Sequence, residues 1–347
     1  MRMVEWKKLG EVCELERGVR VIKKDLQEEG LIPVYQNSLT PLGYFDKSNY
    51  PANTPFVICA GAAGEIGFCN KPFWAADDCT CILCSSSVNK KFIYYCLLVN
   101  QHTLKSQVRK ASVPRLSKDV IGKLIVPIPS MSEQERIVGI LDTFTASIDN
   151  LKEQISQRRK QFECYRDQLL DLEGKPGVEM LKLREACEIR KGIRVVKKQL
   201  KENAQYPVFQ NSIAPMGYYD QFNRNGNMPY IICAGSSSGS VGYCCTPFWA
   251  ADDCFTIESS KVNIRYTYYA LKKNNNNLFR LVRKGSMPRL PHEAIDNMVI
   301  PIPSLVEQQR IVSILDTFEA SISNLEAQLE QRQKQYEYYR NQLLTFA

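Results

Sequence analysis

The sequence contains one long internal repeat, and this repeat limits the possible folds more than any other feature. The string Gln-Asn-Ser at 36–38 returns at 210–212, and Pro-Ile-Pro-Ser at 127–130 returns at 301–304, each 174 positions later. The longer string PFWAADDC at 72–79 returns at 247–254, after a single inserted residue. A period of this length is much longer than any solenoid unit. Each copy should therefore be a globular domain with an appendage.

The first part of each copy is rich in Gly, Pro, Tyr, Phe and Cys and spans about 130 residues. Turn residues bound short β-like runs at 33–35, 55–59, 80–83 and 123–127, with partners at 207–209, 230–233, 255–257 and 297–301. A helix is predicted near 90–100, with its partner near 264–274. These signals predict a compact α+β domain in each copy.

The second part of each copy has the pattern of a long helix with a heptad seam. Apolar residues follow steps of 4, 3, 4, 3 and 4, with polar Arg158 in one slot and Arg332 in the matching slot of the second copy. Serines 130 and 304 stand three residues before a glutamate, which is capping-box spacing. The predicted seam consists of Ile137, Leu141, Phe144, Ile148, Leu151, Ile155 and Phe162 in the first helix, and of Ile311, Leu315, Phe318, Ile322, Leu325, Leu329 and Tyr336 in the second.

Two matched seams in one chain predict that the helices pair with each other, since a single helix cannot bury its seam alone. The predicted fold class is α+β, with two similar globular domains joined by two long antiparallel helices in a coiled coil of roughly 60 Å and a pseudo-two-fold relation. The predicted segments are a domain over 1–130, a helix over 131–171, a domain over 172–304 and a helix over 305–347. A competing interpretation is a seam that waits for a partner protein.

Composition excludes several classes of protein. The chain has 347 residues, no apolar run long enough to span a membrane, and a charged start without the apolar core of a secretory signal. Its 13 cysteines are an odd number in a chain too large to need disulfides, which favours a cytoplasmic protein with reduced thiols. The net charge of +8 weakly favours a polyanionic partner such as nucleic acid.

Basic and amide residues gather at equivalent places in the two copies. Lys and Arg bind phosphates, while Gln and Asn have the geometry that reads adenine. The DNA-binding candidates are Arg17, Arg20, Lys23, Lys24, Gln36, Asn37, Ser38, Arg109, Lys110 and Arg115 in the first copy, and Lys191, Arg194, Lys197, Lys198, Gln210, Asn211, Ser212, Arg283, Lys284 and Arg289 in the second. The plainer alternatives are a solvated surface for the basic residues and a left-handed turn for the Gln-Asn-Ser string.

The motifs at the junctions carry a family resemblance. Residues 124–130 read LIVPIPS and 133–137 read EQERI, while 299–304 read VIPIPS and 307–311 read EQQRI. The opening WKKLGEV at 6–12 with Glu-Arg-Gly at 16–18, and the segments 58–61 and 64–67, add to the match. Over its full length the chain resembles the specificity (S) subunit of type I restriction–modification systems.

The resemblance implies a division of labour between subunits. Each globular part would be a target recognition domain that reads one half of a split site on double-stranded DNA. The helices would set the spacing and dock two methylation (M) subunits, and motor–nuclease (R) subunits would complete the complex. S-adenosylmethionine, ATP and magnesium would belong to those partners, with no cofactor in this chain. The alternative function is a free-standing two-headed DNA-binding regulator without enzyme partners.

Motifs for catalysis are missing from the sequence, so no catalytic residue is predicted. We find neither the N/D-P-P-Y/F motif of amino-methyltransferases nor a G-x-x-x-x-G-K-S/T phosphate loop. His102 and His292 are not shared by the repeat, because they align with Asn276 and Lys118. The sequence therefore offers no good candidate for a histidine that acts as a general acid or base.

Two further clusters need an interpretation. Cysteines at 79, 81 and 84 have spacing suggestive of zinc, but the second copy keeps only Cys254, so no metal site is predicted. The Asp-Asp pairs at 77–78 and 252–253 occur in both copies and read as turn residues that can also accept a hydrogen bond from a cytosine amino group. The likeness of the two copies predicts half-sites that are similar and inverted.

Overall fold

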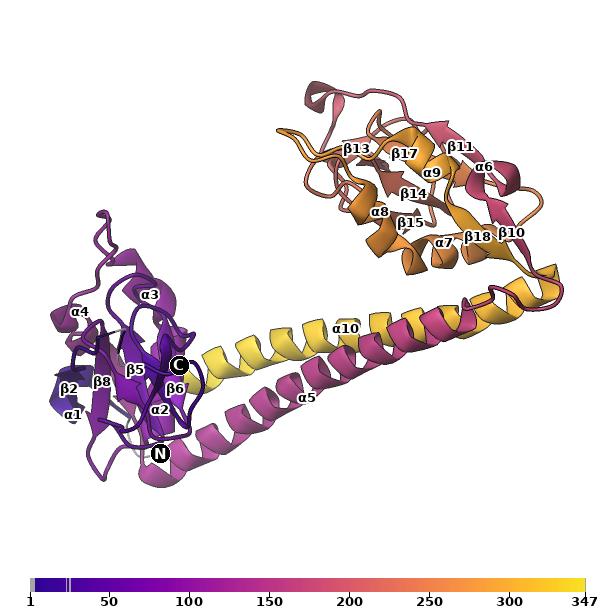
Figure 1. Ribbon diagram of the computed structural model, residues 1–347. Helices are drawn as coiled ribbons and strands as arrows, with labels where there is room; N and C mark the ends of the chain where they lie inside the picture. The colour runs from indigo at the N-terminus through magenta and orange to yellow at the C-terminus, as the bar shows by residue number, and fades with distance from the viewer. Residues whose placement is uncertain (1–3, 23, 25, 347) are drawn as a thin grey trace. The chain divides into compact units, whose positions relative to one another are not determined.

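The computed structural model describes residues 4–22, 24 and 26–346 (Figure 1). The chain divides into two compact units, of which the first runs to Lys152 and takes in Ala327 onward, and the second is Glu153–Glu326. Each unit holds one globular part together with a portion of both long helices, α5 (Met131–Leu169) and α10 (Leu305–Thr345).

The globular part of unit 1 contains short strands and helices in alternation. Its elements are β1 (Glu5–Lys8), α1 (Leu9–Val12), β2 (Cys13–Arg17), β3 (Ile32–Tyr35), β4 (Gly43–Phe45), β5 (Thr54–Ile58), β6 (Ile66–Cys69), β7 (Trp74–Ala75), β8 (Cys79–Cys84), α2 (Lys90–Val99), α3 (Gln101–Ser106), α4 (Lys118–Gly122) and β9 (Ile125–Ile128). They form an antiparallel sheet of order β2-β8-β5-β6, a small sheet of order β4-β3-β7 and a β1-β9 ribbon.

Unit 2 repeats this order. Its elements are β10 (Glu179–Lys182), α6 (Leu183–Ala186), β11 (Glu188–Lys191), the 3-10 helix η2 (Lys197–Gln199), β12 (Tyr206–Phe209), β13 (Gly217–Tyr219), β14 (Met228–Ile232), β15 (Val241–Cys244), β16 (Trp249–Ala250), β17 (Cys254–Glu258), α7 (Ile264–Lys273), α8 (Asn275–Leu281), α9 (His292–Asp296) and β18 (Val299–Ile302). The sheets have orders β11-β17-β14-β15 and β13-β12-β16, with a β10-β18 ribbon. The predicted α+β class and tandem repeat are therefore confirmed.

Each four-stranded sheet has a fully buried central strand. Every residue of β5 and of β14 is buried, which fits strands covered on both faces. On one face α2 packs Phe92 and Ile93 into the core, and α7 packs Tyr266 and Tyr269 in the same way. All the predicted β-like runs overlap observed strands, whereas the edge strands β2 and β6 and the small sheet partners β4 and β7 were not predicted.

A buried glutamine fixes the start of each long helix. Gln134 is fully buried, accepts a hydrogen bond from the Asn89 backbone N–H at 2.8 Å through Oε1, and donates from Nε2 to the Pro129 carbonyl at 2.9 Å. In unit 2, Gln308 makes the same two contacts with Asn263 and Pro303, at 2.9 and 2.8 Å. This pair of contacts explains in physical terms why the Pro-Ile-Pro-Ser and Glu-Gln strings occur together.

The predicted capping boxes are only partly present. Ser304 Oγ accepts a hydrogen bond from the Glu307 N–H at 3.3 Å, but the hydroxyl of Ser130 contacts that of Ser132. Both glutamates instead pair with the arginine three residues later, as in Glu133–Arg136 at 2.7 Å. A bidentate guanidinium is a stronger partner for a carboxylate than one backbone N–H, so the arginine takes the glutamate away from the cap.

The two helices run antiparallel within each unit, as predicted. In unit 1, Phe144 of α5 stacks on Tyr339 of α10 with ring centroids 5.3 Å apart. In unit 2, Tyr165 stacks on Phe318 at 5.2 Å, and Arg159 pairs with Glu326. In unit 2 the later α5 position meets the earlier α10 position. In unit 1, Ile137 shares a core with Leu344, whereas the later Phe144 meets the earlier Tyr339. The competing interpretation, a seam left open for another protein, is therefore wrong for these stretches.

The predicted seam residues are all buried or half-buried. Buried are Ile137, Leu141, Ile148, Leu151, Ile155, Ile311 and Leu315, and half-buried are Phe144, Phe162, Phe318, Ile322, Leu325, Leu329 and Tyr336. The polar slots also have an explanation, because the Arg158 guanidinium lies 5.8 Å from the Phe318 ring centre and that of Arg332 lies 5.7 Å from the Phe144 ring centre. An arginine fits the seam by covering an aromatic ring of the other helix.

Candidate DNA-binding surface

Two loops of unit 1 hold the basic candidates. Arg17 ends β2, and Arg20 and Lys24 are exposed in the segment after it, while Lys23 lies outside the described residues. The second loop joins α3 to α4 and holds three exposed candidates, Arg109, Lys110 and Arg115. The backbones of Arg109 and Arg115 hydrogen-bond to each other at 2.9 and 3.2 Å, so this loop is a narrow hairpin whose two arms carry cations.

Unit 2 places its candidates in the same way. Lys191 ends β11, Arg194 is exposed just beyond it, and Lys197 and Lys198 lie in η2. In the hairpin between α8 and α9, the backbones of Arg283 and Arg289 pair at 2.9 and 3.2 Å, and Lys284 is exposed. The repeat therefore presents the same two cationic loops twice.

The Gln-Asn-Ser strings follow β3 and β12 and serve the backbone in part. The Asn37 carbonyl accepts a hydrogen bond from the Ala62 N–H at 2.9 Å, and Ser38 Oγ donates to the Thr40 carbonyl at 3.0 Å. Gln36 Nε2 donates to Asp78 Oδ2 at 3.4 Å. In unit 2 the exposed Asn211 packs near Gly235, Gln210 is half-buried, and Ser212 Oγ accepts from the Ala214 N–H at 3.1 Å. In unit 1 the first residue of the string thus faces a carboxylate, while the asparagine and the serine shape a turn.

A pocket of unit 1 brings two of the candidate arginines to the Asp-Asp pair. Its volume is about 190 Å³, and it is lined by Arg17, Cys59, Ala60, Asp77, Asp78, Thr80, Arg115, Leu116 and Lys118. The Arg17 Nε donates to the Asp77 carbonyl at 2.6 Å, and its Nη2 lies 3.9 Å from Asp77 Oδ2. The pocket holds cations and carboxylates together, so it can present donors and acceptors at once.

Unit 2 has the equivalent pocket, with a volume of about 470 Å³. It is lined by Ile189, Lys191, Cys233, Asp252, Asp253, Phe255, Arg289, Leu290, Pro291 and His292. Arg289 Nη2 donates to Asp253 Oδ1 at 3.3 Å. The Oδ1 atom of Asp252 is buried, and among the residues that the structure describes none hydrogen-bonds to it. An acceptor in that position is costly to leave unpaired.

One cysteine lines each pocket, Cys59 in unit 1 and Cys233 in unit 2, and both are poor nucleophiles. Burial raises the pKa of the Cys59 thiol, although Thr80 and Arg17 oppose the shift. Burial also raises the pKa of Cys233, to which the negative charge of Asp253 adds, while Arg289 opposes it. Thiols of raised pKa stay protonated at neutral pH, so thiolate chemistry is not supported in either pocket.

Sequence reasoning did not single out every residue of these pockets. The sequence favours turn residues for the Asp-Asp pairs, and it gives little weight to His292 and its counterpart Lys118 because the residue type differs between the copies. The structure places Lys118 in the lining of the unit 1 pocket and His292 in the lining of the unit 2 pocket, where His292 stacks on Phe255 at 4.7 Å. A basic or titratable residue at the same position of both copies was the signal available.

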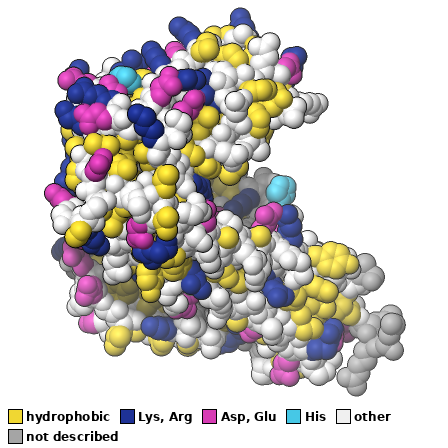
Figure 2. All heavy atoms as spheres, turned by 90° about the vertical axis from the view of Figure 1, so that its right-hand side faces the viewer, with side chains coloured by type: hydrophobic (Ala, Val, Ile, Leu, Met, Phe, Trp, Pro, Cys, Tyr) yellow, Lys and Arg dark blue, Asp and Glu magenta, His cyan; other side chains and the backbone are white. Residues whose placement is uncertain are grey.

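On the face shown in Figure 2, positive and negative side chains are interspersed and do not form one large basic patch. Figure 2 shows one face of the molecule, on which Lys and Arg side chains lie among acidic and hydrophobic ones. The local placement of cations in the two loops therefore distinguishes this surface better than the net charge does.

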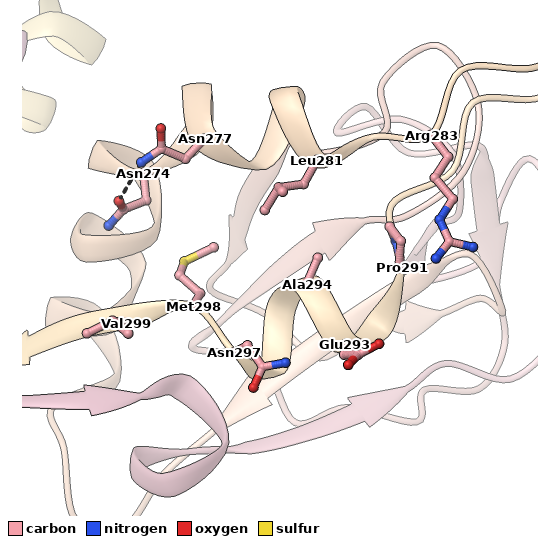
Figure 3. Close-up of a pocket in the computed structure, with 10 residues that line it drawn as sticks. All are labelled: Asn274, Asn277, Leu281, Arg283, Pro291, Glu293, Ala294, Asn297, Met298 and Val299. Carbon is pink, nitrogen blue, oxygen red and sulfur yellow. Dashed lines mark hydrogen bonds between the residues drawn. The ribbon is translucent and has the colours of Figure 1, made fainter.

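A separate cavity of unit 2 lies between α8, α9 and the start of β18 (Figure 3). Its volume is about 640 Å³, with Asn274 and Asn277 at one end, joined by a hydrogen bond of 3.3 Å, and Arg283 at the other. Met298 and Leu281 contribute apolar wall between them. Arg283 and Arg289 thus line different cavities although their backbones are paired.

Glycines between β5 and β6 make a tight turn. Gly61 and Gly64 have φ of 79° and 89°, and Gly235 and Gly239 of unit 2 have 87° and 93°. These left-handed conformations favour glycine, which accounts for glycine at these four positions.

The described residues form neither a candidate metal site nor a candidate membrane span. No group of three or more His, Cys, Asp or Glu among the described residues could hold a metal ion. The described helices include none that is long and apolar enough to cross a membrane. The cysteines are free thiols, most of them buried.

Comparisons with known proteins point in one direction. The family model described as type I restriction modification DNA specificity domain matches residues 2–158 and again 176–333. The specificity subunits of type I restriction enzymes from Haemophilus influenzae and from Escherichia coli are each 28% identical to this chain, cover 99% of it, and are themselves covered over 96% and 94% of their lengths. The crystal structure of the S subunit of a type I restriction–modification system from Mycoplasma genitalium has the same fold, with a TM-score of 0.77 and 19% identity over 99% of this chain and 97% of that one.

Proposed function

The chain belongs to the family of type I restriction modification DNA specificity proteins, and we propose that it is the subunit that selects the DNA sequence in such a system. Each of the two matched domains reads one half of a split site on double-stranded DNA. The observation that carries this function is the duplication itself, because the same cationic loops and the same Asp-Asp pocket occur in both units. A protein with two related reading surfaces matches a DNA target with two related halves.

DNA contact is assigned to the two loops and the pocket between them. The exposed cations of the loops supply phosphate affinity through counterion release, and the pocket residues face base edges. Among the amide candidates of unit 1, Gln36 is better placed than Asn37, whose backbone carbonyl shapes a turn.

The paired helices act as the spacer and as the attachment site for two methylation subunits. Their seam residues are occupied within each unit, so a partner meets the outward faces. A specificity subunit chooses the site without transforming it. Adenine methylation with S-adenosylmethionine, and DNA motion and cleavage with ATP and magnesium, belong to the methylation and motor–nuclease subunits. A complex that acts on cellular DNA works in the bacterial cytoplasm.

The two half-sites are similar and inverted. The support is the close likeness of the two units and the antiparallel course of α5 and α10. A free-standing regulator would use the same loops but would have no need of a helix surface for enzyme partners. Neither the family match nor the full-length likeness to specificity subunits favours that alternative.

Long-read methylation sequencing tests the proposal directly. Cells that lack other adenine methyltransferases receive this chain together with its cognate methylation subunit, and controls receive either protein alone. We expect one split adenine-methylated motif with related, inverted halves, seen only when both are present. Assembly of the two proteins without any methylated motif would make the chain an inactive relative. Failure to assemble would favour the free-standing DNA binder, and two unrelated halves would contradict the predicted symmetry of the site.

A further inference from the structure

Two cysteines of unit 1 face each other across neighbouring strands. Cys13 begins β2, Cys84 ends β8, and the two residues are direct partners in the antiparallel ladder. The Sγ of Cys13 donates a hydrogen bond to the Sγ of Cys84 over 3.1 Å. We infer that this pair is an oxidation site, at which hydrogen peroxide converts two thiols into a reversible disulfide that fastens β2 to β8. The inference goes beyond the proposed function and stands independently of it.

The geometry of the pair suits a disulfide. Residues opposite each other in an antiparallel ladder have Cα atoms roughly 4.5 to 5.5 Å apart, which lies within the span of about 4.4 to 6.8 Å that disulfides bridge. The two sulfur atoms have to approach each other by about 1 Å to reach bonding distance. Strand β2 lies at the edge of its sheet, with β8 as its neighbour, so it can follow this movement.

The two thiols differ in access and in acidity, which assigns the order in which they react. Cys84 is half-buried and is followed by three exposed serines at 85–87, so a small oxidant in solvent can approach it. The hydrogen bond from Cys13 lowers the pKa of Cys84 against the opposing effect of burial, and the charge of Lys90 adds to this shift. The same hydrogen bond and burial raise the pKa of Cys13. Cys84 is therefore the thiol that reacts with peroxide, since the thiolate is the nucleophile.

The oxidation balances in two steps. The Cys84 thiolate attacks one oxygen of hydrogen peroxide, the O–O bond breaks, and hydroxide leaves with the electron pair, so the sulfur becomes a sulfenic acid. The Cys13 sulfur then displaces the hydroxyl group from that sulfur, and the hydroxyl leaves as water with the Cys13 proton. Two thiols and one peroxide thus give one disulfide and two waters. Cys13 is only 5% exposed but does not need to meet the oxidant, because its step takes place within the chain.

Unit 2 has a different residue at the position of the reactive thiol. Cys187 occupies the position of Cys13, but Ser259 occupies that of Cys84. The Ser259 hydroxyl donates a hydrogen bond to the Ala186 carbonyl at 2.8 Å. A hydroxyl cannot form a disulfide, so oxidation at this place distinguishes two otherwise similar units and acts on the first alone.

The cross-link restrains a strand that reaches the unit 1 pocket. Strand β2 runs from Cys13 to Arg17, whose Nε donates to the Asp77 carbonyl at 2.6 Å in the pocket lining. An edge strand is held by a single ladder, and a covalent tie at its first residue opposes its local opening. Oxidation should therefore hold the strand that carries Arg17 more firmly, while β11 of unit 2 stays as it is.

Peptide mapping of the full chain tests the inference. The reduced chain is treated with increasing hydrogen peroxide, the remaining thiols are blocked with N-ethylmaleimide in denaturant, and digests are compared with and without dithiothreitol. We expect an intramolecular disulfide between Cys13 and Cys84, seen as a loss of two hydrogens in mass and fully reversed by dithiothreitol. Cys84→Ser copies the residue that unit 2 carries, and it should abolish the cross-link and leave Cys13 open to blocking.

Cys245→Ser provides a matched control, because it makes the same chemical change at an exposed cysteine of unit 2. Its cross-link should form as in the wild type. Hydrogen exchange of β2 should slow after oxidation of the wild type and of this control, but not of Cys84→Ser, with β11 as the internal reference.

Two results of the mapping would overturn the oxidation site. One is that Cys13 and Cys84 remain separate thiols after the exposed Cys164 and Cys245 have been oxidised. The other is a sulfinic acid on Cys84 without a cross-link, because Cys13 would then have failed to trap the sulfenic acid. A cross-link that leaves the exchange of β2 unchanged would refute the restraint of that strand.

Discussion

At the scale of single residues, the two units differ in how α2 and α7 are held to the long helices. In unit 2, Arg265 of α7 pairs with Asp316 at 2.7 Å and with Glu319, and lies 4.4, 4.9 and 5.1 Å from the ring centres of three tyrosines. In unit 1 the matching Lys91 makes one ion pair, with Asp142 at 2.8 Å, and lies 5.6 Å from the ring centre of Phe68. One duplicated position therefore supports very different numbers of interactions.

Substitution at these two positions should affect stability unequally. Arg265→Met leaves two carboxylates and a tyrosine cluster without their cation, and we expect a loss of about 2 kcal/mol in the free energy of opening α7. Lys91→Met removes one partly exposed pair, for which about 0.5 kcal/mol is expected in α2. Native-state hydrogen exchange over both helices measures the two values. Equal losses would mean that the extra contacts of Arg265 contribute nothing.

At the scale of secondary structure elements, the sequence predicted what periodic patterns encode and missed what pairing decides. The heptad steps located both long helices, and buried strands such as β5 stood out as apolar runs between turn residues. Edge strands such as β2 (CELER) carry charges and gain their structure from hydrogen bonds to β8, which no local pattern reveals. The capping boxes were overestimated because the competing arginines lie in the same helix turn.

The candidate site likewise contains residues that sequence patterns predict and features that only the three-dimensional structure reveals. The cationic loops could be found from repeated Lys and Arg residues alone. The unpaired oxygen of Asp252 could not, because it depends on how the turn before β17 is placed. Lys191 is predicted as a DNA contact, and its place in the lining of the same pocket as Asp252 emerges only from three-dimensional packing.

The helix seam makes a prediction at the same scale. Leu151 is 9% exposed in α5, so Leu151→Glu buries a charge in the seam and should destabilise the helix pair by about 3 kcal/mol. The exposed Lys160 of the same helix serves as the control, since Lys160→Glu changes the charge by more and should leave the pair intact. Urea unfolding followed by circular dichroism at 222 nm reports the helix pair, and co-purification with the methylation subunit reports assembly. Retention of both by Leu151→Glu would argue against the seam as the contact between the helices.

At the scale of the whole molecule, the residues at the end of each long helix do not belong to the core of the unit in which that helix begins. Leu344, near the end of α10, is 4% exposed and belongs to the core of unit 1 with residues such as Leu9 and Phe92. Leu170, which precedes it by 174 positions and follows α5, is 2% exposed and belongs to the core of unit 2. Each long helix therefore begins in the core of one unit and ends in the core of the other.

Because each long helix ends in the core of the other unit, a substitution near its end should destabilise that other unit. Leu344→Ala should open a cavity in unit 1 and destabilise it by about 2 to 4 kcal/mol, although almost all of unit 1 lies more than 190 residues earlier in the chain. Leu170→Ala should destabilise unit 2 by a similar amount. Hydrogen exchange followed by mass spectrometry locates the affected unit, with β5 reporting on unit 1 and β14 on unit 2. Faster exchange of β14 in the Leu344→Ala chain, with β5 unaffected, would contradict the core assignment. Faster exchange of β5 alone would establish that the last turns of α10 complete the core of unit 1.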